Sequence, residues 1–313
     1  MPPGKDALPP GGRWARISRP VRSKAKKFLA WLFSGKSEKA SHLLILPASF
    51  WLSFFLVIPI VLLLVLSLAQ RGPYGTVIWH PTLDNFRRAF TPLYIPIVAR
   101  TLLYCGAAAV ICLLLGYPTA YFLSFYAGEW RDTFLILLMI PFWTSALVSI
   151  YSWIIILGRD GLMNSVLTGI GLLHTPLDVL NTPFSVILGL VYFYLPFMIL
   201  PLYSSLEKIP KQYMEASYDL GAGAFQTFLK VTLPLSLPGV FAGFILTFVP
   251  CLGDFLTAEF LGGPRTYLIG NLIENQFLMA QDWPFGAALT AVLLGAMLVG
   301  LYYYQKLEAA EIA

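Results

Sequence analysis

Residues Glu207 to Gly239 read EKIPKQYMEASYDLGAGAFQTFLKVTLPLSLPG and lie between two long apolar runs. The stretch is too polar for the hydrocarbon core of a membrane, yet it is not composed like a flexible linker. From Glu215 onward, apolar residues recur at roughly helical spacing, which predicts a helix. Gly221 and Gly223 interrupt that helix, and glycine permits a sharp turn between short helices. The stretch therefore predicts a helix–turn–helix on a membrane surface.

Two prolines, Pro234 and Pro238, follow this turn. Because proline has no backbone N–H and disfavours a helical residue before it, we expect both to end the helical segment just before the next apolar run. Such an element is a rigid lever only if something outside the membrane grips it. Otherwise it is an amphipathic helix resting on lipid. The residues of the stretch alone leave both interpretations open.

The composition indicates an integral membrane protein. Of 313 residues, 58% are hydrophobic and 12% are charged, whereas soluble domains have about 25% charged residues. The formal net charge is +5, but the excess lies in one tail, with ten Lys or Arg residues between Lys5 and Lys39. This concentration argues against nucleic acid as a partner. We expect residues 1–41 to form a largely disordered cytoplasmic tail that is able to bind anionic lipid headgroups.

The apolar runs predict an all-α protein with six membrane-spanning helices, each near the roughly 20 residues that a bilayer requires. Pro141 is expected to kink the third helix. The fifth is expected to be broken near Pro250 and Gly253. With the basic tail on the cytoplasmic side, both termini and the 207–239 stretch are cytoplasmic. The expected spans are 43–69, 102–126, 134–157, 184–206, 240–260 and 284–304.

Motifs for catalysis in this chain are missing from the sequence. There is no G-x-x-x-x-G-K-[ST] stretch to hold nucleotide phosphates, and Ser, His and Asp do not gather in a nucleophile motif. The three histidines are scattered, and the three cysteines lie in apolar runs without metal-ligand spacing. We therefore predict no catalytic residues, no metal site and no cofactor in this chain, and an intramembrane enzyme is disfavoured.

The order Glu215-Ala216-Ser217, three residues, Gly221, nine residues, Val231, one residue, Leu233-Pro234 resembles the EAA loop of permease subunits of ABC importers. The family has Ala where this chain has Ser217. The resemblance favours the lever interpretation and implies that this loop contacts a separate ATPase. The residues to which it assigns this contact are Glu215, Ala216, Ser217, Asp219, Leu220, Gly221, Ala222, Leu233 and Pro234.

Five further regions look like the spermidine/putrescine importer permeases of the PotB type, so that the likeness covers roughly residues 43–305. One departure is Ser149, at a position where relatives often have Arg. The stretches are Gly116-Tyr117-Pro118, Pro141-Phe142-Trp143-Thr144-Ser145, Leu195-Pro196-Phe197-Met198 with Leu202-Tyr203-Ser204-Ser205, Gly253-Asp254-Phe255 with Leu261-Gly262-Gly263, and Ile269-Gly270-Asn271 with Asp282-Trp283-Pro284.

This resemblance implies a type I ABC importer with a MetI-like transmembrane domain in the bacterial inner membrane. The partners it implies are a second, PotC-like permease subunit, two ATPase subunits that hold ATP and Mg, and a periplasmic binding protein. The domains it implies are the tail 1–41, a first transmembrane helix 42–70, a periplasmic loop 71–97, a type I core 98–306 with the EAA loop at 207–239, and a cytoplasmic C-terminus 307–313.

Candidate residues for a cation pathway follow from the cost of placing charge in lipid. Asp254 is expected in the outer half of the fifth span, where a carboxylate needs a cavity or a partner. An interhelical hydrogen bond or a contact with the binding protein is an equally good interpretation of Asp254. A polycation binds carboxylates and aromatic faces, and each aromatic candidate is also explained by plain packing. The candidates are Asp254, Glu259, Trp143, Tyr151, Tyr194 and Phe255.

Other functions remain open at this point. The same scaffold carries ferric iron, opines and other small solutes in related permeases, so the polyamine is one candidate among several. A transporter driven by an ion gradient and a membrane scaffold without transport activity are the alternatives from other classes. The spacing around Glu215 disfavours both of these.

Overall fold

The structure is a computed structural model and describes residues 38–312 of the chain. The expected tail at 1–41 therefore lies almost wholly outside the described residues. The chain divides into two compact units, Met1–Leu63 and Leu64–Ala313. This division falls within helix α2, Glu38–Ser67, whose 30 residues include the first candidate span.

Among the described residues, six helical segments are long and apolar enough to cross a membrane. The predicted class, an all-α protein with six spans, is confirmed, with one short antiparallel hairpin of strands β1 (Gln70–Arg71) and β2 (Val77–Ile78) besides the helices. The spans are Pro47–Ser67, Ile95–Phe125, Ala146–Gly169, Pro183–Leu206, Ala224–Leu252 and Trp283–Tyr302.

Within the second unit, the core is formed by α4 (Ile95–Phe125), α8 (Pro183–Leu206) and α11 (Leu233–Leu252), which pack on one another. Small residues on α4 and α11 allow the close approach. A Cβ added to Gly116 would lie 3.1 Å from the Met198 side chain, and one added to Gly243 would lie 2.8 Å from its sulfur. Close packing through small residues is the usual way in which helices associate in lipid.

The expected third span, 134–157, is two helices rather than one kinked helix. Helix α5 (Arg131–Trp143) ends at Thr144, and α6 (Ala146–Leu157) begins after Ser145. Both linking residues have extended backbone, with ψ of 152° and 130°. Pro141 lies inside α5, and the break comes three residues later, where the Thr144 hydroxyl donates to the Pro141 carbonyl. The expected loop after residue 157 contains a further helix, α7 (Leu162–Gly169).

The fifth span differs from expectation at both ends. Pro234 and Pro238 do not end a helix; both lie inside α11, whose first turn includes Pro234. A π-helical turn, Phe228–Thr232, directly precedes α11. Proline needs no N–H partner in a first turn, and local π geometry accommodates proline in spanning helices. At the other end, α11 stops at Gly253 as predicted, and a separate helix, α12 (Leu256–Leu261), follows.

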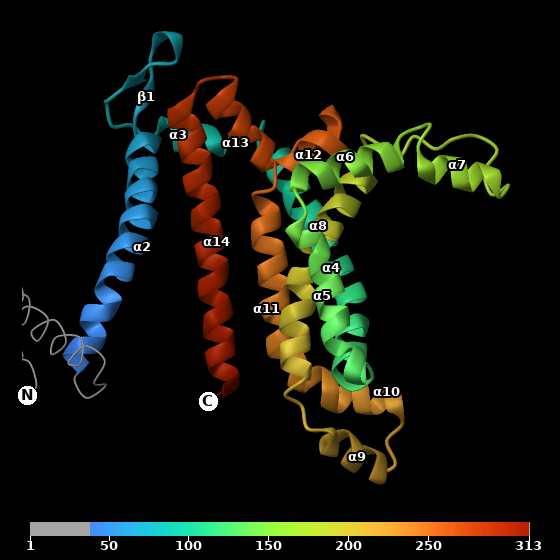
Figure 1. Ribbon diagram of the computed structural model, residues 1–313. Coiled ribbons are helices and arrows are strands. Elements are labelled where there is room, and N and C mark those ends of the chain that lie inside the picture. The colour runs from blue at the N-terminus through green and yellow to red at the C-terminus, as the bar shows by residue number, and fades with distance from the viewer. Residues whose placement is uncertain (1–37, 313) are drawn as a thin grey trace, which may run out of the picture. The chain divides into compact units, whose positions relative to one another are not determined.

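Short helices lie at both ends of the second unit. Figure 1 shows α9 and α10 at one end, toward which the C-terminal half of α14 also runs, and α12 and α13 at the other. The bounds are α3 Asp84–Ala89, α9 Lys211–Asp219, α10 Ala224–Thr227, α13 Ile269–Leu278 and α14 Trp283–Ile312, with 3-10 turns at Pro73–Gly75, Gly128–Trp130 and Pro264–Thr266.

Candidate functional site

The polar stretch between α8 and α11, hereafter the coupling loop (Glu207–Thr232), forms a compact turn of two helices. Helix α9 ends at Leu220, and Gly221 has a φ of +82°. The amide of Gly221 donates to the Tyr218 carbonyl and that of Ala222 to the Ser217 carbonyl. This pair of bonds is the Schellman termination of a helix, which requires a left-handed residue at that glycine. The predicted turn at Gly221 is therefore present.

The coupling loop has two buried apolar anchors and several exposed apolar side chains. Met214 is buried, and Ile209 just before α9 belongs to the main core. Leu220 is 89% exposed and Phe225 is 71% exposed. Large apolar side chains that are exposed on a segment too polar for the hydrocarbon core often mark a binding surface.

The structure brings five of the nine predicted coupling residues together. A hollow of about 580 Å³ lies between α9 and the segment that follows the turn. Glu215 and Asp219 are exposed on α9 and do not line this hollow, while Leu233 and Pro234 lie in the first turn of α11. The five residues that line it are Ala216, Ser217, Leu220, Gly221 and Ala222.

An ion pair that sequence reasoning missed lies where the coupling loop begins. Arg131, the first residue of α5, donates to the Glu207 carboxylate at 2.6 Å. Its guanidinium also lies 5.9 Å from the centre of the Tyr203 ring. Tyr203 and the charge of Glu207 raise the pKa of Arg131. Both charged side chains are partly exposed, so this pair aligns the loop more than it stabilises the fold.

A second candidate site is an apolar cavity of about 480 Å³ at the break between α11 and α12. Asp254 lies in the break and not within a span as expected, because Gly253 ends α11 before it. Its carboxylate accepts the Thr257 amide at 2.9 Å and the Thr257 hydroxyl at 2.7 Å, which orders the first turn of α12. The Tyr194 hydroxyl reaches the same carboxylate at 3.3 Å.

Three of the six predicted pathway residues, Asp254, Tyr194 and Phe255, line this cavity. The other three lie elsewhere. Trp143 is 73% exposed, and the Tyr151 ring lies against Phe260, with ring centres 5.7 Å apart. The sequence grouped all six because they fall in or near the third, fourth and fifth spans, and it did not predict that the third span divides into α5 and α6.

Glu259 belongs to a separate, more polar cavity of about 770 Å³. The Asn271 amide donates to the Glu259 carboxylate at 2.9 Å and to the Phe255 carbonyl at 3.0 Å, which holds α12 against α13. Tyr267 lines the same cavity and donates to the Asn271 carbonyl. Partial burial raises the pKa of the Tyr267 hydroxyl.

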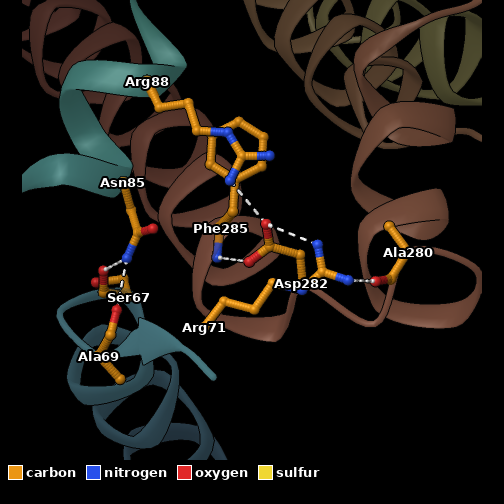
Figure 2. A network of polar contacts seen from close by, with 8 residues as sticks. All are labelled: Ser67, Ala69, Arg71, Asn85, Arg88, Ala280, Asp282 and Phe285. Atoms are coloured by element: carbon orange, nitrogen blue, oxygen red, sulfur yellow. Dashed lines mark hydrogen bonds and ion pairs between the residues drawn. The ribbon is translucent and has the colours of Figure 1, made fainter. Parts of the chain in front are cut away.

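The opposite end of the unit from the coupling loop contains an ion-pair network centred on one buried carboxylate, shown in Figure 2. Asp282, buried at the start of α14, accepts from Arg88 of α3 at 2.7 Å, and Arg71 lies 4.0 Å away. The Arg88 guanidinium stacks 3.9 Å from the centre of the Phe285 ring. Burial lowers the pKa of Arg88, but the hydrogen bond and charge of Asp282 outweigh it, and the net shift is upward.

The same network ties the end of α2 to α3. In Figure 2 the Asn85 side chain points at the carbonyls of Ser67 and Ala69, to which it donates at 2.9 and 2.7 Å. Arg71 donates to the Ala280 carbonyl at 2.6 Å. Sequence reasoning singled out Asp282 only as part of a motif, because its partners Arg88 and Arg71 are about 200 residues away in the chain.

Comparison with known proteins agrees with this architecture. The family model described as "Binding-protein-dependent transport system inner membrane component" matches residues 113–309. The spermidine/putrescine transport system permease protein PotB of Haemophilus influenzae is 43% identical over 255 residues, which cover 81% of this chain and 89% of that protein. PotB of Escherichia coli is 41% identical over 252 residues, which cover 80% and 92%.

A further relative is the inner membrane ABC transporter permease protein YdcU of Escherichia coli, which is 37% identical over 74% of this chain and 77% of that protein. Among solved structures, a bacterial alginate ABC transporter in complex with an alginate pentasaccharide-bound periplasmic protein includes a chain that superposes with a TM-score of 0.70. The match covers 93% of this chain and 95% of that chain at 18% identity, and therefore shows a shared fold.

Proposed function

The chain belongs to the family of binding-protein-dependent transport system inner membrane components, and on that premise we propose that it is the polyamine-conducting permease subunit of an importer driven by a separate ATPase. As a permease of this family it is a multi-pass inner membrane protein and not an enzyme, and it carries no cofactor itself. The observation that carries the polyamine assignment is the identity of about 40% to PotB proteins over four fifths of the chain.

We propose that the coupling loop docks on the ATPase. Two observations support this docking: Leu220 and Phe225 are exposed, and residues of the EAA motif line a hollow. Glu215, exposed on α9, is placed to meet a basic side chain of the ATPase. The buried anchors Met214 and Ile209 make α9 a firm lever, so that a displacement at Leu220 is carried to α8.

The remaining partners follow from the same assignment. ATP and Mg belong to two ATPase subunits, a PotC-like permease completes the pathway, and a periplasmic binding protein delivers the solute. Both termini and the coupling loop are cytoplasmic in this proposal. For the C-terminus, the support is that the C-terminal half of α14 runs toward the end that holds α9 and α10 (Figure 1). The basic tail contacts anionic lipid headgroups at that face.

For the solute, we propose a cation station in the cavity at the helix break. Asp254 supplies the negative charge, and Tyr194 and Phe255 supply aromatic surface. An ammonium group loses its water shell on entering an apolar cavity, so a carboxylate and ring faces must replace that shell. Glu259 offers a second carboxylate in the neighbouring polar cavity. Trp143 and Tyr151 are exposed and lie outside this cavity, and we propose them as further aromatic contacts along the solute pathway.

ATP-driven uptake by the reconstituted complex tests the docking. Glu215→Lys and Gly221→Asp should abolish uptake and co-purification of the ATPase, while the permease still inserts into the membrane. Asp178→Lys, a charge reversal at an exposed residue in a different loop, is the control and should transport normally. Normal transport by the Glu215 and Gly221 variants would overturn the docking.

Uptake of labelled spermidine and putrescine tests the solute. Unlabelled polyamines should compete with the label, and Asp254→Asn should lower the uptake at least tenfold, with Asp178→Asn as the matched control. Competition by ferric chelates or opines, with none by polyamines, would replace the solute while leaving the family assignment intact.

A further inference from the structure

We propose that Tyr117 and Ser217 are positioning residues of one contact chain, which carries the displacement of the coupling loop to α4, the second spanning helix. The proposal rests on the docking of the coupling loop described above. It adds a third helix to the two that are covalently joined to the loop. The chain runs from Ser217 on α9 through Thr227 and Phe228 to Tyr117 on α4 and Ser236 on α11.

The first contact closes the turn of the coupling loop. The hydroxyl oxygens of Ser217 and Thr227 lie 3.0 Å apart, and the Thr227 side chain is buried. Without this bond, α9 and α10 are joined across a link that contains two glycines, Gly221 and Gly223, which transmit a push poorly. The EAA pattern has alanine, which lacks a hydroxyl, at the position of Ser217. In this chain the Ser217 hydroxyl therefore adds a hydrogen bond to Thr227 that the family residue could not form.

The second contact links the loop to α4. Phe228 follows Thr227 directly, and its ring meets the Tyr117 ring edge-on, with ring centres 5.4 Å apart and an interplanar angle of 89°. This is a favoured aromatic geometry. Phe228 also begins the π-helical turn, and such turns are often found at functional sites in helices.

The third contact joins Tyr117 to α11. The Tyr117 hydroxyl lies 2.7 Å from the Ser236 hydroxyl, and Ser236 is fully buried. Ser236 donates its single proton to the Leu233 carbonyl at 3.0 Å, so Tyr117 must be the donor to Ser236. Both hydroxyl groups are therefore committed, which fixes the orientation of the Tyr117 ring against Phe228.

Helix α4 is packed so that it should move as one rigid element when the coupling loop is displaced. Gly116, next to Tyr117, packs tightly against α8, since an added Cβ would lie 3.1 Å from the Met198 side chain and 3.2 Å from that of Ile199. A shift of Tyr117 relative to α8 is therefore resisted by direct packing. Reasoning from the sequence did not connect Tyr117 with the coupling loop, because its contacts Phe228 and Ser236 lie more than 100 positions away in the chain.

The test is the number of labelled spermidine molecules imported per ATP hydrolysed by the complete reconstituted complex. Tyr117→Phe keeps the ring and removes the hydroxyl, and Ser217→Ala restores the residue of the family pattern. Each should lower this ratio about fivefold, the factor typical of one hydrogen bond. Because the two residues act in one contact chain, the double variant should lower the ratio by about the same factor as either single variant.

The controls lie on α4 itself. Tyr104→Phe removes a tyrosine hydroxyl from the same helix, and Ser124→Ala removes a hydroxyl that bonds only within that helix. Neither should change the ratio. An unchanged ratio in Tyr117→Phe, or losses that multiply in the double variant, would overturn the contact chain. If Glu215→Lys and Gly221→Asp also transport normally, the docking proposal is wrong. If these two variants abolish transport while Tyr117→Phe and Ser217→Ala leave the ratio unchanged, the docking stands and only the contact chain is wrong.

Discussion

The two ends of the second unit differ in which side chains they bury and which they expose. At the α3–α14 end, Asp282 is buried and faces Arg88 and Arg71, and Asn85 satisfies two carbonyls. At the coupling loop, large apolar side chains such as Leu220 are exposed, and both members of the ion pair between Arg131 and Glu207 are partly exposed. Both ends join spanning helices, so the difference is not imposed by the membrane.

This contrast separates residues that hold the fold from residues that await a partner. A buried carboxylate left without its cation is costly, so the Asp282 network commits α3 and α14 to one arrangement. An exposed leucine contributes little to folding and is available for binding. The contrast predicts that substitutions at one end change stability and that substitutions at the other change assembly.

The largest effect is expected for Asp282→Ala. Removing the carboxylate takes a charged hydrogen bond from Arg88 and the acceptor from the Phe285 amide, at a cost of about 3 kcal/mol. Thermal unfolding of the purified permease in detergent should show a markedly lower midpoint. Asp178→Ala, at an exposed carboxylate, should unfold like the parent protein. Equal midpoints for the two variants would remove the distinction between the two ends.

Leu220→Asp should show the reverse behaviour. The side chain is 89% exposed, so the unfolding midpoint should stay close to that of the parent protein. Affinity for the ATPase should fall by about 2 kcal/mol, or roughly thirtyfold, as for a central interface residue. Co-purification with the ATPase measures this loss. A variant that loses stability and keeps the ATPase would contradict the assignment of the exposed patch.

Gly221→Ala sharpens the account of the turn. Gly221 has a φ of +82° whereas Gly223 has a φ of −76°, so Gly223→Ala is the matched control. Alanine in the left-handed region costs about 1 kcal/mol. The Gly221 variant should expose α9 to trypsin, which cleaves at Lys211, faster than the Gly223 variant does. Equal cleavage rates would show that the turn carries no strain after substitution.

Glu207→Gln should have the smallest effect. The ion pair with Arg131 is partly exposed, and such pairs contribute at most about 1 kcal/mol. The unfolding midpoint should fall slightly at low salt and not at all at high salt, since salt screens exposed charges. A fall that persists at high salt would show that the pair is a structural element comparable to the Asp282 network.

The six spans, the turn at Gly221 and the break at Gly253 could be predicted from the sequence, because local composition and residue spacing determine each of them. The prediction was wrong about Pro234 and Pro238, since the π-helical turn before them depends on packing against α4. Trp143 does not line the cavity that holds Asp254, and it is exposed next to the break at Thr144, which the sequence did not predict. The Asp282 network and the Tyr117 contacts join residues more than 100 positions apart, which no local pattern encodes.

Modification of a single cysteine at position 220 tests the central claim most directly. The native cysteines are buried, so Leu220→Cys provides one exposed thiol for a membrane-impermeant maleimide. The account predicts labelling in inside-out vesicles, none in right-side-out vesicles, and protection when the ATPase is bound. Labelling from the outside, or labelling that the ATPase does not slow, would contradict it.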